Sequence, residues 1–242
     1  GVAAERTGIS LDRAVDAMFV LYAGLGLAVF ALYRGLSPSL GARSTEPTRP
    51  LGESRRTVLG LAALFSLDSF GGGLVVQSLL ALWLFQRFGV SVAAAGAIFF
   101  WTGVLSAFSA LVAVRIARRI GSLNTAVFTH LPANLFLMLT PFMPTVEWAV
   151  ALLLARSALS QMDVPVRNSY VMAVVTPAER PAAASVTSVP RGLAAALGPV
   201  LSGWLLGLSP FGWPLVIAGA LKSVYDGLLL WRFRAIRPPE ER

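Results

Sequence analysis

The sequence predicts an all-α membrane protein, a bundle of seven transmembrane helices. Its 242 residues are 56% hydrophobic and only 13% charged, and the mean hydropathy is +0.71. A soluble domain of this length cannot bury so much apolar surface, so the bilayer must be the solvent for most side chains. The chain divides into stretches of about 20 or more apolar residues, each long enough to cross a hydrocarbon core of about 30 Å as a helix. These stretches are 14–33, 58–85, 90–114, 123–143, 146–175, 182–208 and 211–231.

The stretches are predicted to be helices because a lone strand or loop cannot satisfy its backbone hydrogen bonds in lipid. The weak ten-residue alternation of a membrane barrel is not visible. Arginines set the orientation, since cytoplasmic flanks collect positive charge. With an outer N-terminus the outer flanks hold only Arg6, Arg13 and Arg87, whereas the inner flanks hold many more, among them Arg34, Arg55, Arg56, Arg180, Arg232 and Arg234. We therefore expect a multi-pass protein of a cell membrane, the inner membrane, with its C-terminus in the cytoplasm.

One connection is much longer than the others and divides the chain into unequal parts. Residues 35–57 contain proline, serine and arginine without apolar periodicity, as in a linker. We expect residues 1–34 to be an outer flank and one helix, 35–57 a cytoplasmic linker, 58–234 a six-helix bundle and 235–242 a cytoplasmic tail. The chain begins with Gly1, and we interpret it as a piece of a longer protein.

Composition argues against several classes of function. The chain has no cysteine, which excludes disulfides and thiolate metal sites, and its single histidine, His130, makes no metal site. The net charge of +8 fits helix ends near anionic lipid heads better than nucleic acid. No G-x-S-x-G, H-E-x-x-H or phosphate-loop motif is present, so we expect neither an enzyme nor a cofactor.

Charged side chains inside the fifth and sixth stretches indicate a polar interior. Arg156, Asp163 and Arg167 lie in the fifth stretch, and Arg191 lies near the start of the sixth. A charge in the bilayer costs about 2.5–3.5 kcal/mol on insertion scales, so such residues normally face a partner or a wet cavity. Asp163 and Arg167, four residues apart, share one helix face with Pro165 between them. We expect these two residues and Arg191 to form a cytoplasmic charge cluster whose pairing changes with conformation.

Asp68 is the main candidate for substrate or proton coupling. It lies about 15 Å into its helix, near mid-membrane, and is followed by Gly71, Gly72 and Gly73, which allow the helix to bend beside a cavity. Desolvation favours the protonated form of a buried carboxyl, so Asp68 is a plausible proton carrier, with Gln77 farther along the same stretch. Arg156 is the candidate to meet an anionic substrate or Asp68 itself. Static pairing remains open for both charged residues.

Two patterns resemble the major facilitator superfamily. The turn after the third stretch is similar to that family's arginine-rich loop, although it lacks the aspartate. The sixth stretch carries small residues similar to the glycine ladder of the family's antiporters, which lets helix backbones touch and lets a helix bend. These patterns read Ala110-x3-Val114-Arg115-x-Ala117-Arg118-Arg119 and Ser185-x8-Ala194-x3-Gly198-Pro199-x2-Ser202-Gly203. Ordinary tight helix packing is the alternative explanation of the ladder.

The resemblance implies that the chain supplies helices six to twelve, with the last six forming an inverted three-plus-three repeat, half of a major facilitator fold. It further implies a secondary transporter that moves a small molecule by alternating access, and the ladder favours proton-coupled efflux. The partners would be protons, lipid and the N-terminal half of the same transporter. Arg115, Arg118 and Arg119 would join the gating charges, and Gly198, Pro199 and Gly203 would be helix-bending sites.

Other interpretations remain open. Seven helices, an outer N-terminus and Lys222 in the last helix resemble a retinal-binding protein, although Ala218 stands where microbial rhodopsins carry an acid. A non-transporting membrane protein with the same fold is a further alternative. Lys222 and Asp226 are four residues apart and are expected to neutralise each other on one helix face. His130 is expected to be a packing residue, with proton sensing as the alternative.

Overall fold

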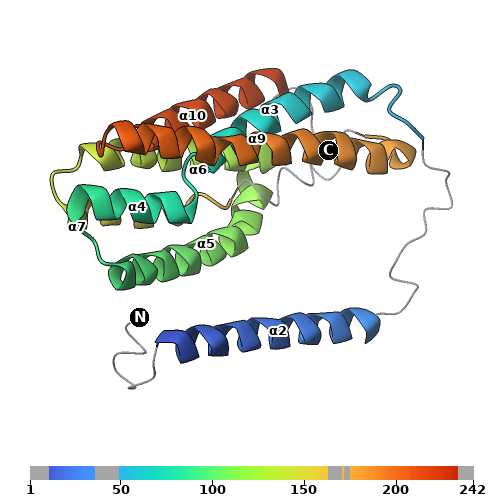
Figure 1. Cartoon of the computed structure of the whole chain (residues 1–242). Helices are drawn as coiled ribbons and strands as arrows, with labels where there is room; N and C mark the ends of the chain where they lie inside the picture. The colour runs from blue at the N-terminus through green and yellow to red at the C-terminus, as the bar shows by residue number, and fades with distance from the viewer. Residues whose placement is uncertain (1–10, 36–48, 163–170, 172–174, 234–242) are drawn as a thin grey trace. The chain divides into compact units, whose positions relative to one another are not determined.

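The protein is helical in a computed structural model that describes residues 11–35, 49–162, 171 and 175–233 (Figure 1). It divides into two compact units, Gly1–Thr45 and Glu46–Arg242. The first unit contains α2 (Leu11–Gly35), which runs through the first predicted stretch. The second unit contains α3 (Arg55–Gly73), α4 (Gln77–Phe88), α5 (Val92–Ile120), α6 (Ser122–Leu139), α7 (Val146–Ser157), α9 (Arg180–Leu208) and α10 (Trp213–Phe233), with the short 3-10 helices η2 (Thr140–Phe142) and η3 (Pro177–Glu179).

Five helical segments in the described part of the chain are long and apolar enough to cross a membrane. They correspond to the first, second, third, sixth and seventh stretches of the sequence analysis. The fourth stretch is also helical, as α6, which has 18 residues and contains His130, Pro132 and Asn134. It is not among the five segments that are long and apolar enough to cross a membrane. The five segments are Asp16–Gly35, Arg55–Phe88, Val92–Ile120, Pro177–Leu208 and Trp213–Arg232.

The second stretch is interrupted rather than continuous. α3 ends at Gly73, and α4 begins only at Gln77, after Val76 has adopted an extended backbone with φ −61° and ψ 149°. Three successive glycines explain the end of α3, because each disfavours helix by about 1 kcal/mol relative to alanine. The expected bend or unwinding after Asp68 is therefore an actual break in the helix.

The fifth stretch also differs from a single continuous helix. α7 ends at Ser157, and turns follow as far as Met162. Two backbone N–H groups, those of Leu159 and Ser160, both donate to the carbonyl of Arg156, which closes the last turn more tightly than an α-helix does. Hydropathy could not reveal this end, because the residues on both sides of Ser157 are mainly apolar.

The last helix, α10, occupies a central place in the second unit. It packs against both α3 and α6, while α9 packs along α3, and α5 lies against α6 and α7. Two buried apolar clusters hold the helices together. One surrounds Trp83 and Leu153, and the other surrounds Phe65 and Tyr225. Because α10 reaches both clusters, polar side chains on its inner face are brought against α3 and α6.

The outer faces of α5 and α9 are strongly apolar. On α5 the side chains of Phe100, Trp101 and Phe108 are exposed, and on α9 those of Leu197 and Trp204 are exposed. A soluble protein rarely exposes contiguous apolar surface of this kind. Such faces suit contact with lipid chains or with further membrane helices, as expected of a membrane protein.

Candidate functional site

A close contact between two backbones fixes the position of the α3 break. Gly73, the last residue of α3, lies against Gly198 in the middle of α9. A Cβ added at Gly198 would lie 2.6 Å from the Cα of Gly73 and 2.7 Å from the nitrogen of Leu74, which real side chains do not tolerate. α9 itself continues as one helix through Pro199. The contact holds the end of α3, and hence Asp68 one turn earlier, at a defined place beside α10.

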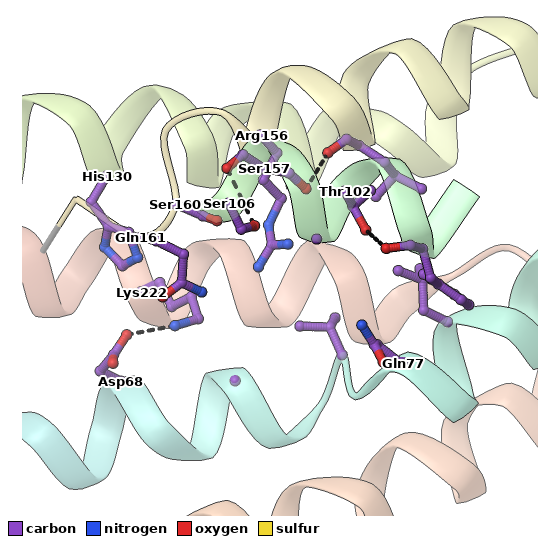
Figure 2. A pocket seen from close by; sticks show the side chains of 16 residues that line it. Asp68, Gln77, Thr102, Ser106, His130, Arg156, Ser157, Ser160, Gln161 and Lys222 are labelled. Atoms are coloured by element: carbon purple, nitrogen blue, oxygen red, sulfur yellow. Dashed lines mark hydrogen bonds and ion pairs between the residues drawn. The ribbon is translucent and has the colours of Figure 1, made fainter. Parts of the chain in front are cut away.

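Asp68 forms a buried ion pair with Lys222. The Nζ of Lys222 donates to the Oδ1 of Asp68 over 2.6 Å, and both side chains are 9% exposed (Figure 2). The pair joins α3 to α10. A carboxylate and an ammonium buried together form a net-neutral pair, whose attraction offsets part of the cost of placing both in a low-dielectric interior.

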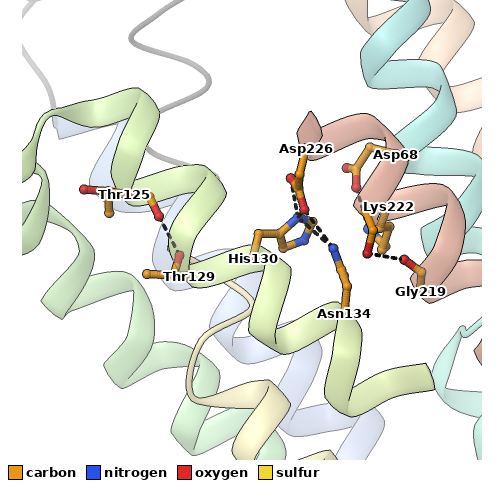
Figure 3. A network of polar contacts seen from close by, with 9 residues as sticks. Asp68, Thr125, Thr129, His130, Asn134, Gly219, Lys222 and Asp226 are labelled. Carbon is orange, nitrogen blue, oxygen red and sulfur yellow. Dashed lines mark hydrogen bonds and ion pairs between the residues drawn. The ribbon is translucent and has the colours of Figure 1, made fainter. Parts of the chain in front are cut away.

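A second buried polar group joins α6 to α10. The Nδ1 of His130 lies 2.9 Å and 3.0 Å from the two carboxylate oxygens of Asp226, and the Nδ2 of Asn134 donates to Oδ2 of Asp226 over 2.8 Å (Figure 3). An ionised carboxylate only accepts, so this geometry requires the hydrogen on Nδ1. Asp226 is 1% exposed, and the Tyr225 ring meets the imidazole edge-on. The carboxylate is therefore well supplied with donors.

Arg156 is positioned differently from these pairs. It stands in the last turn of α7, and its side chain extends from that helix toward α10 (Figure 2). Its Nε atom is buried and has no hydrogen-bond partner among the residues that the structure describes. A buried guanidinium atom without an acceptor is unusual, because buried polar groups are nearly always hydrogen-bonded.

These groups meet at a cavity of about 450 Å³. Its walls come from six helices and from the turn after α7, which is why local sequence cannot reveal it. One part of the lining is apolar, from Val75, Leu80, Phe99 and Leu153. The remainder is polar or glycine: Asp68, Gly72, Gln77, Thr102, Gly103, Ser106, His130, Arg156, Ser157, Ser160, Gln161 and Lys222. The volume lies within the range of small-molecule sites in proteins.

The structure brings together the three residues predicted for substrate or proton coupling. Asp68, Gln77 and Arg156 all line the cavity, although they come from α3, α4 and α7. Gln77 is the first residue of α4 and is exposed. Among the described residues, no group of three His, Cys, Asp or Glu side chains is arranged to hold a metal ion.

The predicted gating residues that the structure describes do not line this cavity. Arg115, Arg118 and Arg119 are exposed near the end of α5, and Arg191 is half-buried on α9. Asp163 and Arg167 lie outside the described residues. Of the expected helix-bending sites, Gly198 contacts α3, Pro199 lies inside the continuous α9, and a Cβ added at Gly203 would meet nothing within 4 Å.

The structure shows side-chain contacts of α6 and α10 that the sequence does not predict. Lys222 and Asp226 are predicted to neutralise each other, but Lys222 bonds to Asp68 and Asp226 bonds to His130 and Asn134. His130, expected as a packing residue, is buried and bonded to Asp226, and it also lines the cavity. The signal that sequence offers is that α6 and α10 each carry two polar residues four apart, a spacing that puts both on one helix face.

Comparison with known proteins adds a family to this geometry. Residues 79–242 match the family model of the Major Facilitator Superfamily, which covers the cavity-lining helices from α4 onward. A membrane protein of Saccharomyces cerevisiae described as uncharacterized is 23% identical over 185 residues, which is 76% of this chain. The chain spans about two fifths of the length of that relative, since the match covers 41% of it.

Proposed function

Because the chain belongs to the Major Facilitator Superfamily, a family of membrane transporters rather than enzymes, we propose that it forms one half of a secondary active transporter. The transporter moves a small molecule by alternating access, and the other half is supplied by the rest of the same protein. The length of the yeast relative supports this division, because the match to this chain leaves more than half of that protein uncovered.

The cavity beside the α3 break carries the proposal. A closed structural core has no use for a polar space of about 450 Å³ among membrane helices, because each polar group in it would be costly. In transporters, substrate sites lie near the bilayer midplane beside interrupted helices. Here α3 stops at Gly73 and α7 stops at Ser157, and both ends border the cavity. We assign the substrate to this space.

Proton coupling is the second part of the proposal. Asp68 is a carboxylate at the cavity wall whose bond to Lys222 ties α3 to α10. Protonation of Asp68 would remove its negative charge and weaken this bond, and so would free α3 to move relative to α10. Proton binding and the movement of a helix at the substrate site are thereby linked, which is the requirement for coupling.

The proposed direction of transport is export. The proposed orientation places the N-terminal side of α2 outside the cytoplasm. The support for export is the ladder of small residues in α9, of which Gly198 packs against the α3 break. Small residues let helix backbones approach closely, and the ladder in α9 resembles the glycine ladder of the family's antiporters. The support for the orientation is the concentration of arginines on the predicted inner flanks.

The test is uptake of a small-molecule library into proteoliposomes of the full-length protein, with and without an imposed proton gradient. We expect at least one solute to accumulate only with the gradient. Asp68→Asn is expected to abolish accumulation while leaving exchange of that solute across the membrane. Glu53→Gln, an exposed acid before α3, is the matched control and is expected to behave as wild type. Equal accumulation by Asp68→Asn and wild type would contradict proton coupling through Asp68.

A further inference from the structure

The described wall of the cavity has one more cationic side chain than it has carboxylates. Three of the described lining residues are acidic or basic side chains other than histidine: the carboxylate of Asp68 and the cations Arg156 and Lys222. Lys222 is already bonded to Asp68 over 2.6 Å. His130 also belongs to the lining, and its ring is bonded to Asp226, which lies outside the lining. Within the described lining, two cations therefore share one carboxylate, which leaves one positive charge in excess.

The guanidinium of Arg156 also has one N–H group, at Nε, without an acceptor among the described residues. Its buried Nε has no partner in the described part of the chain, and the carboxylates described near the cavity have donors of their own. On α5, the hydroxyl of Thr102 donates to the carbonyl of Phe99 and that of Ser106 to the carbonyl of Ser157, so the hydrogens of both are already used. Arg156 thus brings a positive charge to the cavity wall, and its buried Nε has no acceptor among the described residues.

The rest of the wall indicates what kind of molecule fits. Figure 2 shows Arg156 reaching into the cavity between the Asp68 and Lys222 pair and Gln77. The apolar side chains of Val75, Leu80, Phe99 and Leu153 line the same space. A planar guanidinium matches a carboxylate with two parallel hydrogen bonds, and apolar side chains match a hydrocarbon or aromatic body.

We propose that the substrate is a small organic anion, a carboxylate that binds Arg156 with its acidic group and the apolar wall with its body. This inference rests on the proposed function and deepens it, because it names the class of molecule that the transporter carries. Arg156 is then a binding residue, whereas Asp68 and Lys222 form the neutral pair that links the substrate site to the movement of α3.

The experiment compares molecules of equal shape and different charge. The full-length protein in detergent is tested by thermal unfolding and calorimetry against carboxylates of increasing size, each paired with its amide and its amine, for example benzoate, benzamide and benzylamine. We expect carboxylates to bind about tenfold or more tightly than the matched amides, and the amines to bind weakest. This comparison on the wild-type protein requires no variant to fold.

Variants then identify the residue responsible. Arg156→Gln is expected to lose the preference for carboxylate over amide, and Arg156→Lys to keep part of it. Arg87→Gln, which removes an exposed arginine at the end of α4, is the matched control and is expected to keep the full preference. Binding of amides or amines as tight as that of carboxylates, no carboxylate binding at all, or a preference that survives in Arg156→Gln would each overturn the inference.

The outcomes separate this inference from the proposed function. A protein that transports amides or amines in proteoliposomes but shows no carboxylate preference keeps the proposed function and loses the inference. A protein that binds carboxylates through Arg156 but moves no solute in either direction keeps the inference and contradicts the proposed function.

Discussion

Two buried acids in the second unit are bonded to side chains on other helices. Asp68 on α3 accepts from Lys222 on α10, and Asp226 on α10 accepts from Asn134 and contacts His130 on α6. Each acid has a nearby base because an isolated charge in a membrane interior is costly. Arg156, whose Nε lacks such a partner among the described residues, is for the same reason the residue that a substrate is expected to satisfy.

Removing one member of the Asp68 and Lys222 pair is expected to cost more than removing both. Asp68→Asn or Lys222→Met alone leaves a buried charge without its opposite, and such single changes typically cost about 3–5 kcal/mol. The double variant removes both charges and is expected to recover a large part of this loss. Thermal or denaturant unfolding of all four proteins in detergent measures the coupling. Losses that simply add would contradict a direct ion pair.

The contact between His130 and Asp226 gives a second prediction. His130→Leu removes one donor from a carboxylate that is 1% exposed, and we expect a loss of about 1–3 kcal/mol in the free energy of unfolding. Thr129→Val, at the neighbouring position on α6, is the control, because its hydroxyl donates only within its own helix. An unchanged midpoint for His130→Leu would show that the imidazole does not stabilise Asp226.

At the scale of helices, the contact between α3 and α9 depends on two residues without side chains. Gly198→Ala places a methyl group against Gly73 and Leu74, so the two helices must separate or shift. Overpacking of this kind typically costs about 1–3 kcal/mol. Gly207→Ala on the same helix, where nothing lies within 4 Å, is expected to be neutral or slightly stabilising.

Thermal unfolding and transport of the two alanine variants provide the measurement. We expect Gly198→Ala to lower both stability and transport rate, while Gly207→Ala changes neither substantially. The opposite order would show that the ladder serves contacts with lipid or with other helices rather than the α3 break. Equal effects would show that glycine matters here through helix propensity alone.

Much of the helix arrangement could be predicted from hydropathy, and most of the site could not. Apolar length predicts the five segments that are long and apolar enough to cross a membrane, and the three glycines after Asp68 indicate the break at Gly73. The end of α7 at Ser157 was missed because apolar residues continue beyond it. The partners of Lys222 and Asp226 were missed because contacts between distant helices depend on packing, whereas sequence spacing reports only neighbours on one helix.

For the molecule as a whole, the predicted orientation can be tested directly because the chain has no cysteine. Single cysteines placed at Gln86, in the last turn of α4, and at Thr176, before η3, serve as labelling sites, since both positions are exposed. A membrane-impermeant maleimide added to intact cells is expected to label position 86 and to spare position 176. Inverted vesicles are expected to give the reverse pattern.

One labelling pattern would contradict the predicted orientation. If position 176 reacts in intact cells and position 86 does not, the orientation inferred from the arginines is wrong. Reaction at both positions would indicate mixed insertion. The thermal stability of each cysteine variant, compared with that of the parent, is the control that the protein is folded.

The order of α3, α6 and α10 along the chain has a consequence for biosynthesis. Translation delivers Asp68 and His130 well before Lys222 and Asp226 leave the ribosome. Until then, the earlier helices carry these polar groups without the partners that stabilise them in lipid. Stable insertion of α3 and α6 is therefore expected to require α10, and a product truncated before α10 is expected to be retained by insertion machinery or removed by membrane proteases.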